Sequence, residues 1–347
     1  MRFALIGAGN IAKIYVDALA QIPGASIAVV CNRTEASGRA LAEKAGAAWL
    51  PRFEDAVARA DVDAVIAATP SGTHMEIAQA GAQAGKHLLI EKPLDITLAR
   101  VDAMIAAAQQ AGVILACVFP QRFTDGAHVA KAALDAGRLG RLTFCDAVLK
   151  WHRPQSYYDG SWRGTWALDG GGALMNQAIH FVDLLQWLAG PVAAVQGMTG
   201  TLAHSMETED TAGAVLQFVH GGLGMIQAAT SSWPGDPARV ALHGDRGTIK
   251  LEEGRIVQWD LADAEEGEQD QLLGEEASGG SGAGDPMAIG FEKHRRQLVD
   301  FIQAVETGTP PAVDGTEARK SVEIIRAIYR SAAQGKRVTL PLGDDAG

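Results

Sequence analysis

The chain has 347 residues, of which 47% are hydrophobic, so its apolar content is sufficient for two folded cores. Its formal net charge is −11 at pH 7, and the sequence contains no lysine- or arginine-rich block. This balance excludes the broad basic surface that nucleic acids and anionic membranes attract, so we expect neither as a partner.

The cysteines and the apolar segments restrict the expected location. Cys31, Cys117 and Cys145 are odd in number and far apart, which argues against a disulfide framework or a zinc cluster. No apolar run approaches the roughly 20 residues of a membrane span, and a glycine motif at residue 7 leaves no room for a signal peptide. We therefore expect a reduced, cytoplasmic protein.

The first 120 residues alternate short β-rich runs with longer amphipathic stretches. The expected strands are 2–6, 26–30, 64–67, 87–90 and 113–118. The expected helices are 11–21, 35–45, 74–84 and 97–111. Apolar strands separated by helix-length segments are typical of a parallel sheet covered on both faces. We predict a doubly wound α/β Rossmann domain over residues 1–121.

The pattern changes after Pro120, where a helix at 124–136 is followed by several strands joined by short glycine turns. The expected strands are 142–150, 192–201, 212–218, 223–229, 239–243 and 248–251. Residues 122–347 are thus predicted to form an α+β domain with a large, mainly antiparallel open sheet, which binds substrate and joins subunits. Helices are expected at 290–307 and 316–334, the last packing back toward the Rossmann domain, and the acidic, glycine-rich segment 262–286 is expected to be a mobile surface loop.

A glycine motif follows the first strand and opens the first helix. Gly7 permits the tight turn, Gly9 leaves space for a pyrophosphate, and Asn10 and Ile11 begin a helix whose N-terminus faces the phosphates. Since the motif lies between a strand and a helix, it predicts a dinucleotide site rather than a glycine-rich turn without a ligand.

The end of the second strand indicates which dinucleotide is bound. NAD-binding domains commonly carry Asp or Glu here, whereas this chain has Asn32 followed by Arg33. An arginine suits a 2′-phosphate, so NADP is predicted in preference to NAD. An ordinary exposed Arg33 is the alternative.

Five motifs in order resemble the glucose–fructose oxidoreductase / inositol dehydrogenase / rhizopine catabolism (Gfo/Idh/MocA) family. They begin with the glycine motif and continue as 69–74 (TPSGTH), 91–93 (EKP), 121–123 (QRF) and 170–183, which contains GGG, His180 and Asp183. The resemblance covers nearly the whole chain and implies a nicotinamide-dependent oxidoreductase. It implies that the lysine of the EKP motif lies between nicotinamide and substrate. It further implies cofactor contacts from the motif residues Thr69, Pro70, His74, Glu91, Lys92 and Arg122.

Lys92 and His180 are the predicted catalytic residues. Hydride transfer at a carbinol carbon requires a proton to leave or join the oxygen, and a donor that stabilises the developing alkoxide. Lys92 can polarise the oxygen and His180 can exchange the proton. Members of the family commonly carry Asp-x-Gly-x-His here, but this chain has Asn176 in place of the Asp, so only hydrogen bonding to a substrate hydroxyl is expected of that position.

Aromatic residues concentrate between 151 and 166 in a chain that is only 6% aromatic. Flat rings beside fixed donors suit a sugar or polyol, and we expect Trp162 to contact it together with Lys92, Asn176 and His180. Arg153 and Arg163 could bind a carboxylate or phosphate on a sugar acid or nucleotide sugar. The alternative is that several tryptophans belong to the core or to a subunit interface.

Two other functions stay open at this point. Related sequences also act on non-sugar cyclic substrates such as dihydrodiols or tetrapyrroles, and a regulatory protein could bind NADP and a sugar without reacting them. No histidine or cysteine spacing indicates a metal site. A homo-oligomer, dimer or tetramer, is expected because the second sheet would expose one face.

Overall fold

The computed structural model describes residues 1–273 and 290–343, and these divide into two compact units. The first unit comprises Met1–Phe119 and Gly290–Arg319, and the second comprises the described residues of 120–289 and 320–346. The second unit is therefore not the continuous segment 122–347 that the sequence suggested, because 290–319 returns to the first. That the second unit binds substrate and joins subunits stays a prediction.

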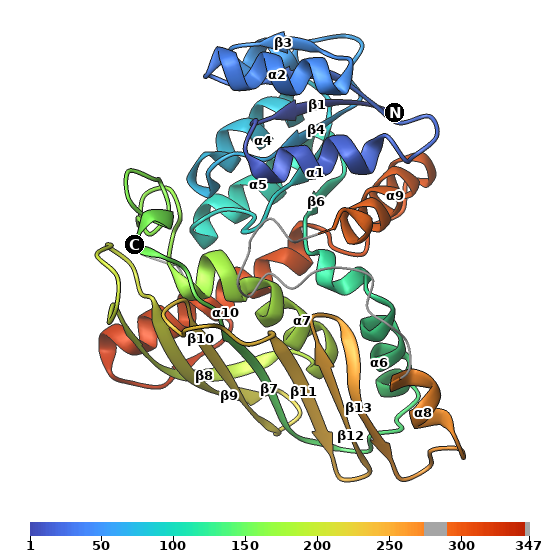
Figure 1. Cartoon of the computed structure of the whole chain (residues 1–347), viewed down its shortest axis with the longest axis vertical. Helices are drawn as coiled ribbons and strands as arrows, with labels where there is room; N and C mark the ends of the chain where they lie inside the picture. The colour runs from blue at the N-terminus through green and yellow to red at the C-terminus, as the bar shows by residue number, and fades with distance from the viewer. Residues whose placement is uncertain (274–289, 344–347) are drawn as a thin grey trace. The chain divides into compact units, whose positions relative to one another are not determined.

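The first unit contains a six-stranded parallel sheet in the order β3-β2-β1-β4-β5-β6. Its strands are β1 (Arg2–Ile6), β2 (Ser26–Cys31), β3 (Ala48–Leu50), β4 (Ala64–Ala67), β5 (His87–Ile90) and β6 (Leu115–Cys117). β1 and β4 lie side by side, and the strand order reverses between them (Figure 1). A reversal of this kind opens a crevice at the carboxyl ends of the strands, where α/β proteins bind ligands. The predicted doubly wound sheet is confirmed.

The helices of this unit are α1 (Asn10–Leu19), α2 (Glu35–Ala45), α3 (Phe53–Val57), α4 (His74–Gln83), α5 (Leu98–Ala111) and α9 (Glu292–Thr307). Figure 1 shows α9 beside α1. Phe301 of α9 is fully buried, and its ring centroid lies 6.3 Å from that of Phe3 in β1. Burial of this apolar helix face explains why the chain returns to the first unit. The last helix, α10 (Gly315–Gln334), begins in the first unit and continues in the second from Lys320.

The second unit contains an eight-stranded sheet in the order β13-β12-β11-β7-β10-β9-β8-β14. Its strands are β7 (Leu142–Lys150), β8 (Val192–Gly200), β9 (Thr211–Phe218), β10 (Leu223–Ala229), β11 (Arg239–Gly244), β12 (Gly247–Glu252), β13 (Arg255–Leu261) and β14 (Val338–Thr339). Neighbours are antiparallel except β10 and β7, which are parallel. The predicted mainly antiparallel sheet is confirmed.

Helices cover one face of the second sheet. α7 (Ile179–Ala189) packs on β7 and β11, α6 (Asp125–Asp135) packs on β12 and β13, and Ile328 of α10 lies against Gly197 of β8. On the opposite face Phe144, Val215 and Leu223 are exposed. Exposed apolar side chains on an open sheet commonly join subunits, so a homo-oligomer stays our prediction.

Helix α8 (Glu268–Leu273) lies within the segment 262–286 that was predicted to be a mobile loop. Arg138 donates two hydrogen bonds to the Glu268 carboxylate, at 2.6 and 2.9 Å, and its guanidinium lies over the Trp259 ring. This bidentate ion pair fixes the helix, so the loop prediction is wrong for 268–273. Residues 274–286 lie outside the described part of the chain.

Within the described ranges 1–273 and 290–343, no helix is both long enough and apolar enough to cross a membrane.

Candidate active site

The turn between β1 and α1 contains two glycines with different requirements. Gly7 has φ +109°, and a Cβ there would lie 2.2 Å from the Ala68 carbonyl oxygen at the end of β4. Only glycine permits this close approach of two backbones. A Cβ on Gly9 would have nothing within 4 Å, so the space above it is open.

The start of α1 presents main-chain N–H groups to that open space. Gly9 caps the helix without a side-chain hydrogen bond, and the first turn contains no acidic residue. Asn10 is exposed, Ile11 is half-buried, and Ala12 packs fully buried beneath them. An uncapped helix N-terminus next to a glycine cradle fits the pyrophosphate of a dinucleotide.

The end of β2 carries the residues expected to select the cofactor. Asn32 donates through Nδ2 to the Thr34 carbonyl and to Ser37 Oγ, both at 2.9 Å, so its amide supports the loop. Arg33 is exposed at the same loop. Arg39 of the following helix lies 4.5 Å over the Trp49 ring and donates to the Glu35 carboxylate at 2.7 Å.

Two loops of the first unit are tied together by His74. This side chain is fully buried, with Nδ1 3.0 Å from the Pro93 carbonyl oxygen and Nε2 3.1 Å from that of Thr69. Burial lowers the pKa of the imidazole. His74, predicted to contact a cofactor, therefore links the loop that begins with Thr69 and Pro70 to the loop that carries Lys92.

Lys92 follows a buried carboxylate. Glu91 accepts a 2.5 Å hydrogen bond from the Tyr15 hydroxyl of α1 and a 3.2 Å hydrogen bond from the Lys92 main-chain N–H. Burial raises the pKa of Glu91, although its hydrogen bonds and the Lys92 charge oppose this. Lys92 itself is half-buried. Glu91 thus anchors the backbone from which Lys92 projects.

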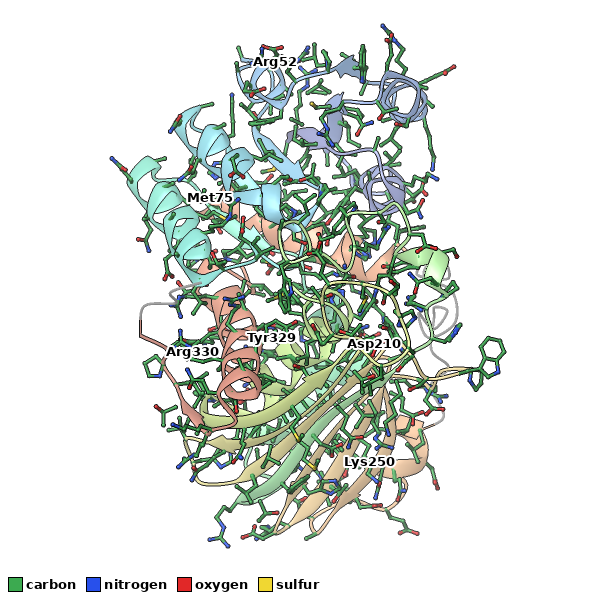
Figure 2. The ribbon with its side chains drawn as sticks, turned by 90° about the vertical axis from the view of Figure 1, so that its left-hand side faces the viewer. Arg52, Met75, Asp210, Lys250, Tyr329 and Arg330 are labelled. Atoms are coloured by element: carbon green, nitrogen blue, oxygen red, sulfur yellow. The ribbon has the colours of Figure 1, made fainter. Side chains whose placement is uncertain are left out.

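Asp95 and Arg100 hold the same loop and were not predicted. Asp95 is fully buried and accepts from the N–H of Met75 (Figure 2) at 2.9 Å and from Arg100 Nε at 2.6 Å. Arg100 also donates to the Gly72 carbonyl at 2.9 Å. An acidic residue two positions after Pro93 was the available signal.

In the second unit, the glycine cluster 170–172 is explained by packing. A Cβ on Gly171 would lie 2.1 Å from the Tyr329 hydroxyl, and one on Gly172 would lie 1.8 Å from the Glu209 carbonyl oxygen. The chain then forms a π-helical turn, Ala173–Ala178, that leads directly into α7. Such turns are frequent at functional sites.

Glu209 holds the start of this turn. It is buried and accepts from the N–H groups of Gly172 (3.0 Å) and Leu174 (2.8 Å), and from the hydroxyl of Tyr329 (2.9 Å). Figure 2 labels Tyr329 on α10 and Asp210, the residue after Glu209. Burial raises the pKa of Glu209 to about 7 despite these donors. Sequence reasoning missed Glu209, whose only signal was a short acidic run.

Asn176 and His180 lie one helical turn apart. Asn176 is in the π-helical turn and donates through Nδ2 to the buried Asp169 at 2.5 Å, while His180 is half-buried at the second position of α7. Asp183 forms a buried bidentate ion pair with Arg122, with both distances 2.7 Å. Arg122, predicted to contact a cofactor, is thereby fixed to α7.

Two arginines of the second unit stack on aromatic rings. The guanidinium of Arg153 lies 4.9 Å from the Trp151 ring and 5.7 Å from the Tyr157 ring. That of Arg163 lies 4.5 Å from the Tyr157 ring and 5.1 Å from the Trp162 ring. We call this alternating set the arginine ladder. Arg153 is buried and its Nη1 donates to the His152 carbonyl at 2.8 Å, whereas Arg163 is half-buried and its Nη1 donates to Ser161 Oγ at 3.3 Å. Stacking on the rings orients both guanidinium groups.

The raised pKa of Glu209 predicts a pH-dependent stability. Between pH 4.5 and about 7 the folded protein retains a proton on Glu209 that the unfolded chain has lost. The contribution of this proton to the free energy of unfolding is therefore complete below pH 4.5 and is lost as pH rises to about 7. Glu209→Gln should remove up to about 3 kcal/mol of that decline. Urea unfolding of wild type and variant at pH 5 and pH 8 measures the difference.

Glu207→Gln is the matched control, because Glu207 is exposed and lies two residues away. In this variant the free energy of unfolding should change between pH 5 and pH 8 as it does in the wild type. If Glu209→Gln shows the same change in the free energy of unfolding as the wild type, Glu209 does not titrate in this pH range.

Comparisons with known proteins agree with this arrangement. Residues 1–119 match a family model described as an oxidoreductase family with an NAD-binding Rossmann fold, and 127–250 match the Gfo/Idh/MocA C-terminal domain. Inositol 2-dehydrogenase of Rhizobium meliloti (strain 1021) is 26% identical, covering 98% of this chain and 99% of that protein. Myo-inositol 2-dehydrogenase of Thermotoga maritima is 28% identical, covering 98% of each.

Among solved structures, the WlbA dehydrogenase of Bordetella pertussis, in complex with NADH and UDP-GlcNAcA, has a TM-score of 0.88. It is 34% identical to this chain, and the match covers 99% of both chains. Both units, and not only the Rossmann sheet, therefore have relatives of the same architecture. The chain belongs to the Gfo/Idh/MocA family of oxidoreductases.

Proposed function

We propose that this NAD(P)-dependent oxidoreductase acts on a carbinol carbon of an anionic sugar, with a nucleotide-linked sugar acid as the preferred class. Its action on CH–OH groups of sugars or polyols follows from its relatives, which include inositol dehydrogenases. Arg163 of the arginine ladder supports the finer statement, because a half-buried guanidinium held between two aromatic rings suits a planar anion. The complex of the WlbA dehydrogenase with UDP-GlcNAcA is consistent with it.

The cofactor would be held by the first unit. Gly7, Gly9 and the first N–H groups of α1 fit the pyrophosphate, and Thr69 and Pro70 border the next loop. When bound, the nicotinamide supplies or accepts the hydride. Asn10 and Ile11 would lie beside the pyrophosphate and Arg33 on the adenosine side, and NADP stays the predicted preference.

The proton chemistry is assigned to Lys92 and His180. A cationic lysine stabilises negative charge that develops on the substrate oxygen, and an imidazole exchanges a proton near neutral pH. Glu91 and His74 hold the loop of Lys92, and the π-helical turn sets the start of α7 for His180. Asn176 and Trp162 would contact the sugar, and Arg153 and Arg163 its anionic group.

The cofactor preference can be tested at Arg33. Arg33→Ala should weaken NADPH binding about 10- to 100-fold, because a charge-assisted contact to a 2′-phosphate is lost, and should leave NADH binding unchanged. Titration followed by quenching of tryptophan fluorescence measures both dissociation constants. Arg141→Ala, an equal charge change at an exposed residue of the second unit, is the control. Wild-type protein that prefers NADH would refute the NADP prediction.

Lys92→Met should lower kcat by about 10²- to 10³-fold, the range expected for loss of a group that stabilises a developing alkoxide. Dinucleotide binding should be retained, because the glycine turn is untouched. The comparison requires steady-state kinetics with a sugar panel and a parallel cofactor titration. Lys44→Met, at an exposed helix residue, serves as control, and turnover that survives in Lys92→Met would refute the assigned role.

The arginine ladder predicts a substrate preference. Arg163→Leu should reduce kcat/KM for sugars that carry a carboxylate or diphosphate by about 10- to 100-fold, and change that for neutral sugars little. Arg163→Lys keeps the charge but not the planar stack, so its kcat/KM for acidic sugars should lie between those of the wild type and Arg163→Leu. If acidic and neutral sugars are affected equally, the ladder supports the fold and does not select the substrate.

A further inference from the structure

Asp169 is a buried carboxylate in the loop before the glycine cluster. Its side chain is fully buried, Oδ2 accepts from the Gly164 N–H at 2.8 Å, and Oδ1 accepts from Asn176 Nδ2 at 2.5 Å. Its own N–H donates to the Thr165 carbonyl at 3.1 Å. Asp169 therefore joins the aromatic segment, which contains Trp162 and Arg163, to the turn that carries Asn176.

The carboxylate determines which way the Asn176 amide faces. Because a carboxylate only accepts hydrogen bonds, the amide nitrogen of Asn176 must face Asp169, and its oxygen Oδ1 must face away. Oδ1 accepts from Gln177 Nε2 at 3.1 Å, and Gln177 Nε2 also lies 3.0 Å from the Tyr157 hydroxyl oxygen. Tyr157 is the central ring of the arginine ladder.

The result is one continuous hydrogen-bond chain, in which Asp169 accepts from both neighbours and Gln177 Nε2 donates to both of its own. It runs from Gly164 through Asp169, Asn176 and Gln177 to Tyr157, and reversing any amide in it would place two donors or two acceptors together. Two structural segments expected to bind substrate thus share one buried support.

We propose that Asp169 is a positioning residue of the substrate site, which orients the Asn176 amide and, through Gln177, the ring of Tyr157. A neutral side chain at 176 is then required by Asp169, since a second carboxylate 2.5 Å away would force the pair to share a proton. This inference rests on the proposed function, because that function assigns Asn176 to the sugar and the arginines that stack on Tyr157 to its anionic group.

A reciprocal exchange tests the proposal. Asp169→Asn leaves one oxygen for two donors, and Asn176→Asp opposes two carboxylates, so each single variant should lose about 10- to 100-fold in kcat/KM. In the double variant, the amide introduced at position 169 would accept from Gly164 and donate to the carboxylate introduced at position 176, which would in turn accept from Gln177. Every hydrogen bond of the chain is thereby restored, and the negative charge moves from position 169 to position 176. The double variant should therefore recover at least about fivefold over the product of the single effects.

The controls separate positioning from a general loss of folding. Asp159→Asn is the matched variant, because Asp159 also accepts from an amide, that of Gln155 at 2.8 Å, but is exposed in the same segment. It should keep wild-type kinetics. Unfolding temperature and NAD(P)H binding are measured for every variant, and both should stay close to wild type where kcat/KM falls.

Two results would overturn the proposal. Strictly multiplicative single effects, or losses that follow the unfolding temperature alone, would show that Asp169 supports only the fold. If the wild-type protein turns over no sugar in the panel, the proposed function itself is refuted, and this inference with it. If the wild type is active but the effects of the changes at 169 and 176 on kcat/KM are independent, only the role of Asp169 is refuted.

Discussion

The chemistry-bearing half of the second unit depends on how one buried carboxylate is hydrogen-bonded. Glu209 accepts from two main-chain N–H groups at the start of the π-helical turn and from the hydroxyl of Tyr329. Removing a carboxylate from water costs several kcal/mol unless donors replace the water, and three donors converge here. Gly171 and Gly172 are required because any side chain would collide with Tyr329 or with Glu209. The position of Asn176, and of His180 one turn later, follows from that packing.

The first unit uses the same arrangement at the loop of Lys92. Glu91 is tied to α1 through Tyr15, and Asp95 is tied to the start of α4 through Met75 and to α5 through Arg100. These bonds cross between elements that are distant in the chain, so the loop is fixed from several sides. A lysine that must present its ammonium group in one direction benefits from a backbone held in this way, because preorganised charges cost no reorganisation during reaction.

The parts of the fold that sequence predicts are those set by local pattern. The strand and helix around Gly7 and Gly9 follow from spacing alone, and α2 and β7 were predicted to the residue. β3 and α3 were missed because three and five residues are too few for periodicity to appear. α8 was missed because its composition resembles that of a loop, and because Arg138, which forms the ion pair with Glu268, lies 130 residues earlier in the chain. Glu209 and Asp169 were missed for the same reason, since their importance lies in nonlocal donors that no spacing reveals.

Hydrogen bonds and ring stacking in the second unit connect Asn176 with the arginine ladder. Tyr157 contacts both guanidinium groups of the ladder and lies one hydrogen bond from Gln177, which is bonded in turn to Asn176. The carboxylate of Asp169 is already occupied by donors from Gly164 and Asn176. A second carboxylate at 176 would have to share a proton with Asp169, and the fixed amide donor that now faces Asp169 would be lost. In the proposed function, the amide at this position also offers a hydrogen-bonding group to a sugar hydroxyl. In the proposed function, Asn176 and the arginine ladder therefore belong to one hydrogen-bonded support for the sugar.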